Sequence, residues 1–310
     1  MDILADILKA LKLRGTVYFH ASFHAPWGMK IPRGEFASFH IITAGGCWLR
    51  TDSHQKPVRL EYGDILIFPR GDSHSLCHEP DAEPVMAKEL LSRPRQEPEE
   101  SADVAFGGDG AATTHLICGH FEYDREYPHV LFETLDDCLH IQARLQNDPQ
   151  WSLQASQLAA SLSTANTPGG GVVLDRLAET LFIHALVAHV NALEDRDNFL
   201  LALHDQNLGR ALKLMHDDPA QNWKLEDLAA ACYMSRSVFA DKFKRMVGVP
   251  PMVYLARWRM LKARGLLANT QLSMARIAEQ VGYQSPFAFA KAFKKIVGQA
   301  PGAVRREAQA

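Results

Sequence analysis

The sequence predicts a multidomain α+β protein with an N-terminal β-barrel, a helical linker and an all-α C-terminal part. Three observations lead to this fold class. The 310 residues are about twice as many as a typical domain contains. Short apolar runs between turn residues fill residues 16–90, whereas apolar residues recur at helical spacing from about Leu131 onward. The last third of the chain contains an internal repeat.

Charge is distributed unevenly along the chain, although the net charge is only −3. Residues 205–310 carry 17 Lys and Arg against 8 Asp and Glu, a net charge of +9, so residues 1–204 carry −12. This asymmetry favours a C-terminal part that binds a polyanion. The alternative is a helical surface that is simply rich in Lys and Arg. The composition, 47% hydrophobic and 22% charged, excludes a wholly disordered chain.

Cysteine usage and the apolar segments favour a cytoplasmic protein without membrane contact. The five cysteines lie far apart and form no Cys-x-x-Cys pair, which argues against a zinc site or a disulfide framework. Asp2 and Asp6 interrupt the apolar N-terminus, so we expect no signal peptide. Residues 172–193 form the most apolar helical segment, but its three charged side chains exclude a simple membrane span.

Residues 1–130 are expected to form the β-rich sensor domain. Apolar runs between Gly, Pro and Asp predict strands at residues 36–42, 47–51, 58–60, 65–68 and 115–123. Short strands at this spacing are typical of a β-barrel or sandwich. Residues 92–113 are rich in Pro, Glu and Gly, and we expect them to be a flexible loop within this domain.

Residues 131–204 are expected to be a helical linker. Helices are predicted at 153–162 and 172–193, with a Pro-Gly-Gly-Gly break between them. The second helix has a wide apolar face, which could pack on the barrel or form a dimer seam, and periodicity does not decide between the two. A homodimer is therefore one expected assembly of this chain.

The repeat, residues 225–251 and 274–301, has the pattern of two helix-turn-helix motifs, at about 225–248 and 274–298. In each copy a short helix and a tight turn precede a serine, whose oxygen can cap the next helix. Two phenylalanines four residues apart then share one buried face, and a glycine ends the helix. The matching positions, 50 residues apart, are Ser235 and Ser285, Phe239 and Phe289, Phe243 and Phe293, and Gly248 and Gly298.

The opposite face of each second helix is slim or basic, as a helix must be to enter the major groove of DNA. A plain helical bundle is the alternative, but a bundle requires neither the slim faces nor the basic helix ends. Residues 252–267 predict one long helix between the copies. A rigid helix of this length would let both recognition helices enter successive major grooves. Double-stranded DNA is thus the expected partner.

These motifs resemble the AraC/XylS family of bacterial transcription regulators over residues 205–307. The resemblance implies that residues 205–310 form a seven-helix DNA-binding domain whose two recognition helices read adjacent major grooves. It places base-facing positions on Ser237, Ala240, Asp241, Phe287, Ala290 and Lys291. Basic residues expected to contact phosphates, or to be solubilising charge, are Arg236, Lys242, Lys244, Arg245, Lys294 and Lys295. Ala240 and Asp241 offer few donors to base edges, so we expect the first helix to contribute more shape fit than hydrogen bonding.

The segment 63–74 (GDILIFPRGDSH) predicts a turn, a buried strand and a second turn that leads to His74. It resembles the second conserved motif of cupins, which are small double-sheet barrels, and residues 39–49 resemble the middle of the first motif. A cupin-like domain before an AraC-type module looks like one subgroup of the family, which includes regulators that sense reactive chlorine or other electrophiles. The resemblance implies a small-molecule or oxidant effector.

Most of the metal ligands of cupin enzymes are missing from this chain. Ser38 stands at the expected Glu position, and no histidine occurs at residues 31–34, where a His-x-His pair belongs. We therefore expect no metal, no cofactor and no enzyme activity. The alternative is a metal-dependent cupin enzyme fused to a DNA-binding module. The histidines that remain as effector candidates, each of which could equally be a hydrogen-bonded core residue, are His24, His40, His74 and His78.

Two cysteines are candidate redox residues. Cys118 lies in a β run at the place where chlorine-sensing relatives have a reactive cysteine, but their partner cysteine would lie near Ala21 and is absent here. Cys47 is the second candidate. The alternative is that both cysteines are small buried hydrophobes.

Together these expectations describe a cytoplasmic, sequence-specific transcription regulator. We expect an activator that responds to an effector or an oxidant and that contacts RNA polymerase. An architectural DNA-binding protein without an effector is a further alternative.

Overall fold

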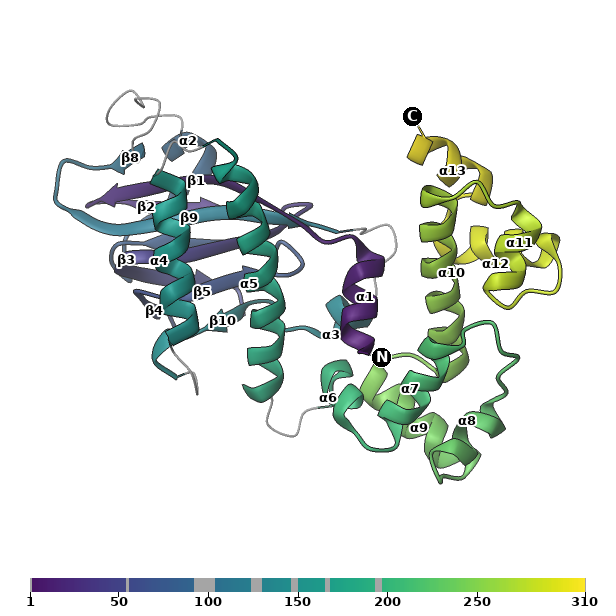
Figure 1. Cartoon of the computed structure of the whole chain (residues 1–310). Coiled ribbons are helices and arrows are strands. Elements are labelled where there is room, and N and C mark those ends of the chain that lie inside the picture. Colours follow the sequence, from purple (N-terminus) through teal and green to yellow (C-terminus); the bar gives the residue numbers. More distant parts are fainter. Residues whose placement is uncertain are drawn as a thin grey trace. The chain divides into compact units, whose positions relative to one another are not determined.

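The structure is a computed structural model, and it describes residues 2–53, 56–91, 104–123, 130–145, 150–164, 168–192 and 197–309. These residues form two compact units (Figure 1). The β unit contains the described residues between 13 and 123 and between 135 and 192. The helical unit contains residues 2–12, 130–134 and 197–309.

The β unit is built on a mostly antiparallel sheet. Its strands are β1 (Arg14–His24), β2 (Gly28–Ile31), β3 (Ala37–Thr51), β4 (Val58–Glu61), β5 (Ile65–Phe68), β6 (His74–Cys77), β7 (Val85–Met86), β8 (Val104–Gly107), β9 (Ala112–Glu122) and β10 (Leu139–Ile141). Neighbouring strands follow the order β7-β2-β6-β3-β9-β1-β8. Strands β4 and β5 also pair with β3, and β10 pairs with β5.

Strand β3 curls this sheet, because its two halves pair with different neighbours. Residues 37–45 pair with β9, and residues 46–51 pair with β4 and β6. The strand bends at Gly45, where φ is +68° and a Cβ would collide with the carbonyl oxygen of Thr113. Only glycine fits such a position. The curled sheet forms the cupin half-barrel, which confirms the fold class expected from the sequence.

The interior of the half-barrel is packed with apolar side chains. They are Ala21, Phe23, Trp27, Met29, Ile42, Leu49, Leu60, Leu66, Phe68, Leu76, Phe106 and Leu116. Cys47 and Cys118 are buried in the same cluster. The polar side chains of His40 and His74 are buried as well. Buried polar groups are destabilising unless they are hydrogen-bonded, so these two histidines require partners.

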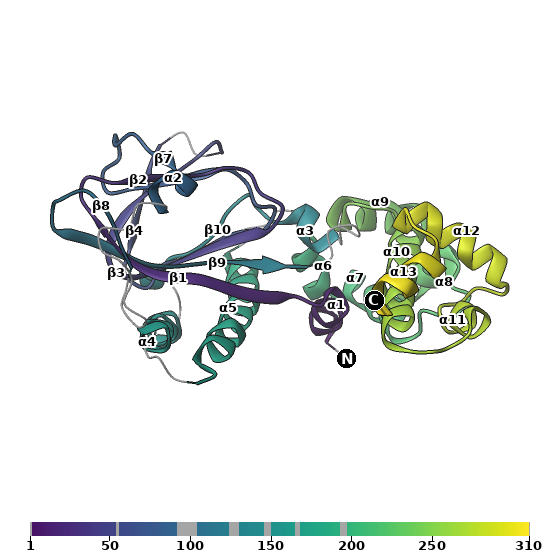
Figure 2. The same cartoon turned by 90° about the horizontal axis from the view of Figure 1, so that it is seen from above.

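Helices α4 (Gln150–Thr164) and α5 (Gly170–Ala192) lie side by side against the outside of the sheet (Figure 2). Helix α5 is fastened to β1 by two carboxylates. Asp175 Oδ1 accepts the Val17 N–H at 3.0 Å, and Glu179 Oε1 accepts the Gly15 N–H at 3.2 Å. The fully buried Phe182 of α5 packs on Phe121 of β9, with ring centroids 4.9 Å apart. Helix α5 therefore packs on the barrel, which is one of the two roles that the sequence leaves open for its apolar face.

The sequence-based strand pattern needs three corrections. The runs 36–42 and 47–51 are one strand, β3, because the two glycines between them bend the strand without ending it. The sequence does not predict β1, β2, β6, β7 or β10 individually, since these strands are short or their polar residues obscure the alternation. Strand β10 also departs from the helical linker expected at residues 131–204, because it pairs with β5, which is distant in the sequence. Within the predicted loop 92–113, residues 104–107 form β8 by parallel pairing with β1, and Ala112 begins β9. Residues 92–103 lie outside the described residues.

The helical unit contains α6 (Phe199–His204), α7 (Leu208–Asp217), α8 (Leu225–Ala231), α9 (Arg236–Val247), α10 (Pro251–Asn269), α11 (Met274–Gln280), α12 (Pro286–Val297) and α13 (Pro301–Gln309). The long helix α10 supplies the centre of the core with Tyr254 and Trp258, each 1% exposed. His216 lies between them: its Nε2 is 2.7 Å from the Tyr254 hydroxyl, and its ring stacks on Trp258. No helix in the described part of the chain is long and apolar enough to span a membrane.

Two short segments from the N-terminal half belong to the helical unit. Helix α1 (Ile3–Leu11) buries Ile7, Leu8 and Leu11 and packs on α7 and α10. Helix α3 (Val130–Thr134) packs on α6, where the Asn198 side chain donates to the Thr134 carbonyl at 2.8 Å. The division of the structure therefore differs from the boundary expected at residue 130. The reason is that the apolar faces of both segments find their partners more than 60 residues away in the sequence.

Candidate DNA-binding surface and candidate sensor site

The first helix-turn-helix consists of α8 and α9 with a capped turn between them. Ser235 Oγ accepts the Val238 N–H, and Gly248 ends α9 in the left-handed conformation, with φ +84°. Phe239 and Phe243 are fully buried beneath α9. The side chains that α9 exposes are Arg236, Ser237, Val238, Asp241, Lys244 and Arg245, with Ala240 half-buried beside them.

The second helix-turn-helix, α11 and α12, repeats this construction. Ser285 Oγ accepts the Ala288 N–H at 3.1 Å, and Gly298 ends α12 with φ +85°. Phe289 and Phe293 are buried. The opposite face forms a groove beside α12 lined by Phe287, Ala290, Lys291, Lys294, Lys295, Ala300 and Pro301. Phe287 is 81% exposed, which is unusual for a phenylalanine that has no role in binding.

The two copies differ at their turns. Tyr233 has φ +55° and is 81% exposed, with the Arg210 guanidinium 5.0 Å from its ring centroid. The matching residue in the second copy is Gly282, where a Cβ would lie 2.7 Å from the Ala220 carbonyl oxygen. The second turn therefore requires glycine, whereas the open first turn accommodates a tyrosine in a conformation that costs about 1–2 kcal/mol.

Not every basic residue of α9 is available to DNA. Lys242 Nζ lies 2.6 Å from Asp205 Oδ2, and both side chains are three-quarters buried. Arg236 pairs with Glu226 and Arg245 pairs with Asp197, but these pairs are exposed and break at little free-energy cost. Lys244, Lys291, Lys294 and Lys295 are exposed.

The β unit brings three of the predicted effector residues together in its core. His40 Nε2 lies 2.8 Å from His74 Nε2, and His40 Nδ1 lies 3.1 Å from Cys118 Sγ. His74 Nδ1 lies 2.9 Å from the Asp72 carbonyl oxygen. The ring of Phe68 stacks on that of His74 at 3.6 Å. Strand pairing explains the contact with the thiol, because His40 of β3 stands directly opposite Cys118 of β9.

One arrangement of protons satisfies this chain of contacts. A carbonyl oxygen only accepts, so His74 Nδ1–H donates to Asp72. His74 Nε2 then accepts from His40 Nε2–H, and His40 Nδ1 accepts from the Cys118 thiol. Cys118, His40, His74 and the Asp72 carbonyl thus form one directed chain, which we call the thiol–imidazole chain.

The thiol–imidazole chain is neutral at pH 7. Burial lowers the pKa of His40 well below its usual range, and the neighbouring His74 lowers it further. Burial lowers the pKa of His74 to about 4, although its bond to the Asp72 carbonyl acts in the opposite direction. Burial also raises the pKa of the Cys118 thiol far above its usual range. Neither a thiolate nor an imidazolium is therefore present in the resting core.

The remaining sequence candidates lie elsewhere. His24 Nδ1 contacts the Gly110 carbonyl at 3.1 Å, and His78 Nδ1 contacts the Trp27 carbonyl at 2.6 Å. Cys47 is buried, and burial raises the pKa of its thiol. Among the described residues, no three His, Cys, Asp or Glu side chains are placed to hold a metal ion together. Asp72 and Phe68 carry no signal in the sequence for these roles, because their contacts with His74 depend on the turn before β6.

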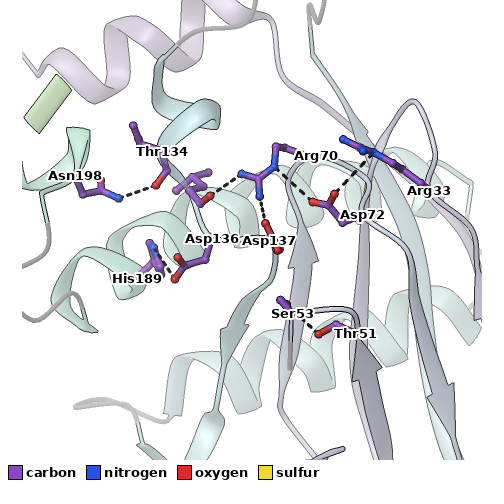
Figure 3. Close-up of polar contacts among 11 residues, drawn as sticks. Arg33, Thr51, Ser53, Arg70, Asp72, Thr134, Asp136, Asp137, His189 and Asn198 are labelled. Atoms are coloured by element: carbon purple, nitrogen blue, oxygen red, sulfur yellow. Dashed lines mark hydrogen bonds and ion pairs between the residues drawn. The ribbon is translucent and has the colours of Figure 1, made fainter. Parts of the chain in front are cut away.

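Arg70 connects Asp72, at the end of the thiol–imidazole chain, to the segment that follows α3. Its Nε lies 3.5 Å from Asp72 Oδ2, its Nη1 donates to the Leu135 carbonyl at 2.6 Å, and its Nη2 binds the Asp137 carboxylate (Figure 3). Asp136 in the same segment lies 3.8 Å from His189 Nε2 of α5. The turn that carries Asp72 is therefore fixed to residues 135–137, which continue directly from the last residue of α3.

Comparison with known proteins assigns the chain to a family. The cupin family model matches residues 2–191, and a helix-turn-helix domain model matches residues 228–307. A putative AraC-like transcription regulator of Streptomyces antibioticus is 30% identical over 310 residues, which is 99% of both chains. This chain belongs to the AraC family of transcription regulators.

Other relatives of this AraC-family regulator extend over its whole length. The HTH-type transcriptional regulator AlkR of Acinetobacter baylyi is 27% identical over 99% of this chain and 100% of its own. The RCS-specific transcriptional activator RclR of Escherichia coli is 22% identical over 98% and 97%. The solved DNA-binding domain of AdpA in complex with a target DNA is 30% identical and covers 33% of this chain and 91% of its own, with a TM-score of 0.31.

These findings confirm the resemblance to the AraC/XylS family and to cupins. The chain is a sequence-specific DNA-binding transcription regulator with an N-terminal cupin domain. Its relatives are regulators and not enzymes, so the enzyme alternative is not supported.

Proposed function

We propose that this regulator is an activator whose β unit receives a small-molecule or oxidant signal and whose helical unit responds by changing its DNA binding. The observation that carries the proposal is the continuous connection from Cys118 to residues 135–137. It runs through His40 and His74 to Asp72, and then through Arg70. A core selected for stability alone would place apolar side chains at these buried positions.

An oxidant is one signal that this chain of contacts could report. Conversion of the Cys118 thiol to a sulfenic acid by a peroxide proceeds through the thiolate, which forms when Sγ passes its proton to His40 Nδ1. The step adds an oxygen to sulfur and releases water. The added oxygen has no room between Sγ and His40 Nδ1, which are 3.1 Å apart. The His40 ring must therefore move, and this movement breaks the contact between His40 and His74. The relative named as an RCS-specific activator supports a signal of this chemical class.

The DNA contacts follow from the exposed faces of α9 and α12. Base edges are read by Ser237, Ala240, Asp241, Phe287, Ala290 and Lys291, whose side chains are short or project from the slim faces. Phosphates are contacted by Arg236, Lys244, Arg245, Lys294 and Lys295. As an activator, the regulator contacts RNA polymerase at the promoter.

The outer face of the α4–α5 pair supports a homodimer. Leu158 of α4 and Val173, Ile183 and Val187 of α5 are each between 42% and 51% exposed, although α5 packs its other face on the barrel. Such a row of apolar side chains is typical of an interface between helices. Analytical ultracentrifugation of the Ile183→Lys, Val187→Lys double variant tests this arrangement: a dimer that persists in the variant would refute it.

The proposed function is tested by measuring the affinity for promoter DNA before and after treatment with hydrogen peroxide, in the wild type and in two variants. Cys118→Ser keeps a donor for His40 but removes the oxidisable thiol. Cys47→Ala removes a thiol from the same core that forms none of the hydrogen bonds of the thiol–imidazole chain. We expect the DNA affinity of wild type and of Cys47→Ala to change on treatment and that of Cys118→Ser to remain constant. An equal response in all three proteins would refute the role of Cys118.

A further inference from the structure

Phe287 lies in the first turn of α12, and its ring is almost fully exposed. Ser285 caps this helix and Pro286 is its first residue, so Phe287 is the second residue of α12. The buried face of the helix is already formed by Phe289 and Phe293. An exposed phenyl ring gains stability only when a partner covers its apolar surface. The position of Phe287 therefore favours contact with an apolar group outside the helical unit.

The surface around Phe287 combines an apolar groove with basic side chains. Ala290, Ala300 and Pro301 line the groove beside the ring. Three lysines complete the lining, namely Lys291, Lys294 and Lys295. Among the described residues, no Asp or Glu belongs to this lining. Lysines attract the phosphates at the edges of a DNA groove, and the apolar part of the lining is left to meet the base edges.

The two recognition helices present different chemistry to the bases. Residues 286–292, the first two turns of α12, contain a single polar side chain, that of Lys291. The matching residues of α9, 236–242, contain four polar side chains. The residue of α9 that matches Phe287, 50 positions earlier, is Ser237. Helix α12 must therefore read bases by apolar contact to a greater extent than α9.

The major groove of DNA offers one apolar group to such a helix. This group is the 5-methyl of thymine, whereas the other exposed groups of the base edges are hydrogen-bond donors and acceptors. The N-terminal residues of a recognition helix contact the base edges, and Phe287 is one of these residues. A phenyl ring at this position can make a favourable apolar contact with thymine.

We propose that Phe287 recognises the 5-methyl group of a thymine and so determines the base preference of the DNA segment that α12 binds. The inference rests on the proposed function, because it requires that α12 enter the major groove. It deepens that function by naming the chemical group that is read.

Replacement of thymine by deoxyuridine in the preferred DNA site of the full chain tests the proposal. The site is obtained by selection from a randomised library, and each thymine is replaced singly. Deoxyuridine forms the same base pair but lacks the 5-methyl group. Fluorescence anisotropy at one salt concentration measures Kd. We expect wild type to lose about fourfold in affinity at one or two adjacent thymines, the effect of burying one methyl-sized group.

Phe287→Ala should bind the thymine and deoxyuridine sites equally at those positions. Because the ring is exposed, this variant should fold as wild type does. Val238→Ala removes an exposed apolar side chain from α9 and is the matched control. It should keep the fourfold difference at those positions.

Equal binding of thymine and deoxyuridine by wild type at every position of a selected site would overturn the proposal and leave the proposed function intact. A loss of affinity in Phe287→Ala that leaves the difference between thymine and deoxyuridine unchanged would also overturn it, since the ring would then stack between bases and another residue would read the methyl group. Selection of no preferred sequence at all would refute the reading of bases in the proposed function and this inference with it.

Discussion

Lys242 and Asp205 tie the first recognition helix to the start of α7 through an ion pair of 2.6 Å. Asp205 also accepts the Leu208 N–H at 2.8 Å, so one carboxylate caps α7 and holds α9. Burial raises the pKa of Asp205, but the hydrogen bonds from Leu208 and Lys242 outweigh it, and the net pKa is lowered. Lys242 is thus a structural residue that carries a charge on a DNA-binding helix.

This ion pair predicts that Lys242 of α9 and the exposed Lys294 of α12 respond differently to substitution. Lys242→Met should lower the free energy of unfolding by about 1 kcal/mol, since the pair is only partly screened by water. It should leave the salt dependence of DNA binding unchanged. Urea unfolding and DNA titrations at several salt concentrations measure both quantities. A reduced salt slope in Lys242→Met would show that Lys242 contacts phosphate.

Lys294→Ala is the comparison variant on α12. Lys294 is exposed and forms part of the groove beside Phe287. If it contacts a phosphate, the variant should bind all DNA sequences more weakly, and the slope of log K against log salt should fall by about 0.9. Stability should remain as in the wild type. An unchanged slope would remove Lys294 from the phosphate-contacting residues.

Lys291→Ala tests the assignment of a base-facing residue. Lys291 lies one helical turn after Phe287 on the exposed face of α12. Loss of a base contact should cost about 1–3 kcal/mol at one position of the preferred site and relax the preference there. Selection from a randomised site library measures this change. A uniform loss of affinity across all sequences would place Lys291 at the DNA backbone.

Stability should decrease in mild acid because three histidines are buried in the neutral form. Burial lowers the pKa of His216 to about 3, with Lys262 adding to the effect, and burial lowers the pKa of His74 to about 4. The unfolded chain binds these protons near pH 6.5, so the contribution is complete above that pH and is lost as the pH falls toward the folded values. Each histidine contributes a slope of about 1.4 kcal/mol per pH unit within this window.

Urea unfolding between pH 7 and pH 5 measures that slope. His216→Gln removes one titrating group. It should therefore reduce the slope of unfolding free energy against pH for the helical unit by the contribution of one proton, about 1.4 kcal/mol per pH unit. Lys9→Ala, at an exposed position of the same unit, is the control and should not alter this slope. A slope that is identical in His216→Gln and wild type would show that His216 does not titrate in this range.

Helix α1 should stabilise the helical unit, although it lies at the opposite end of the sequence. Leu11→Ala removes a fully buried side chain from the contact with α7 and α10 and should cost about 2–5 kcal/mol. Hydrogen exchange should increase in α7 and α10 and remain unchanged in the strands of the β unit. Faster exchange in the strands alone would contradict the assignment of α1 to the helical unit.

The two units differ in how far the sequence predicts them. The helix-turn-helix pair depends on local signals, such as the serine caps and the paired phenylalanines, which neighbouring residues in the sequence contain. The thiol–imidazole chain depends on strand register: His40 and Cys118 are 78 residues apart and meet only because β3 pairs with β9. The docking of α1 on α10 is equally non-local. Local pattern carries no information about either contact.

The most direct test of the account is a methylation-interference footprint of the full chain on its preferred DNA site. If α9 and α12 both read bases, guanine methylation should block binding in two major-groove segments whose centres lie about 10 base pairs apart on one face of the duplex. Lys291→Ala should weaken interference in one segment only. A single segment, or interference that does not depend on sequence, would contradict the claim that two recognition helices read the DNA.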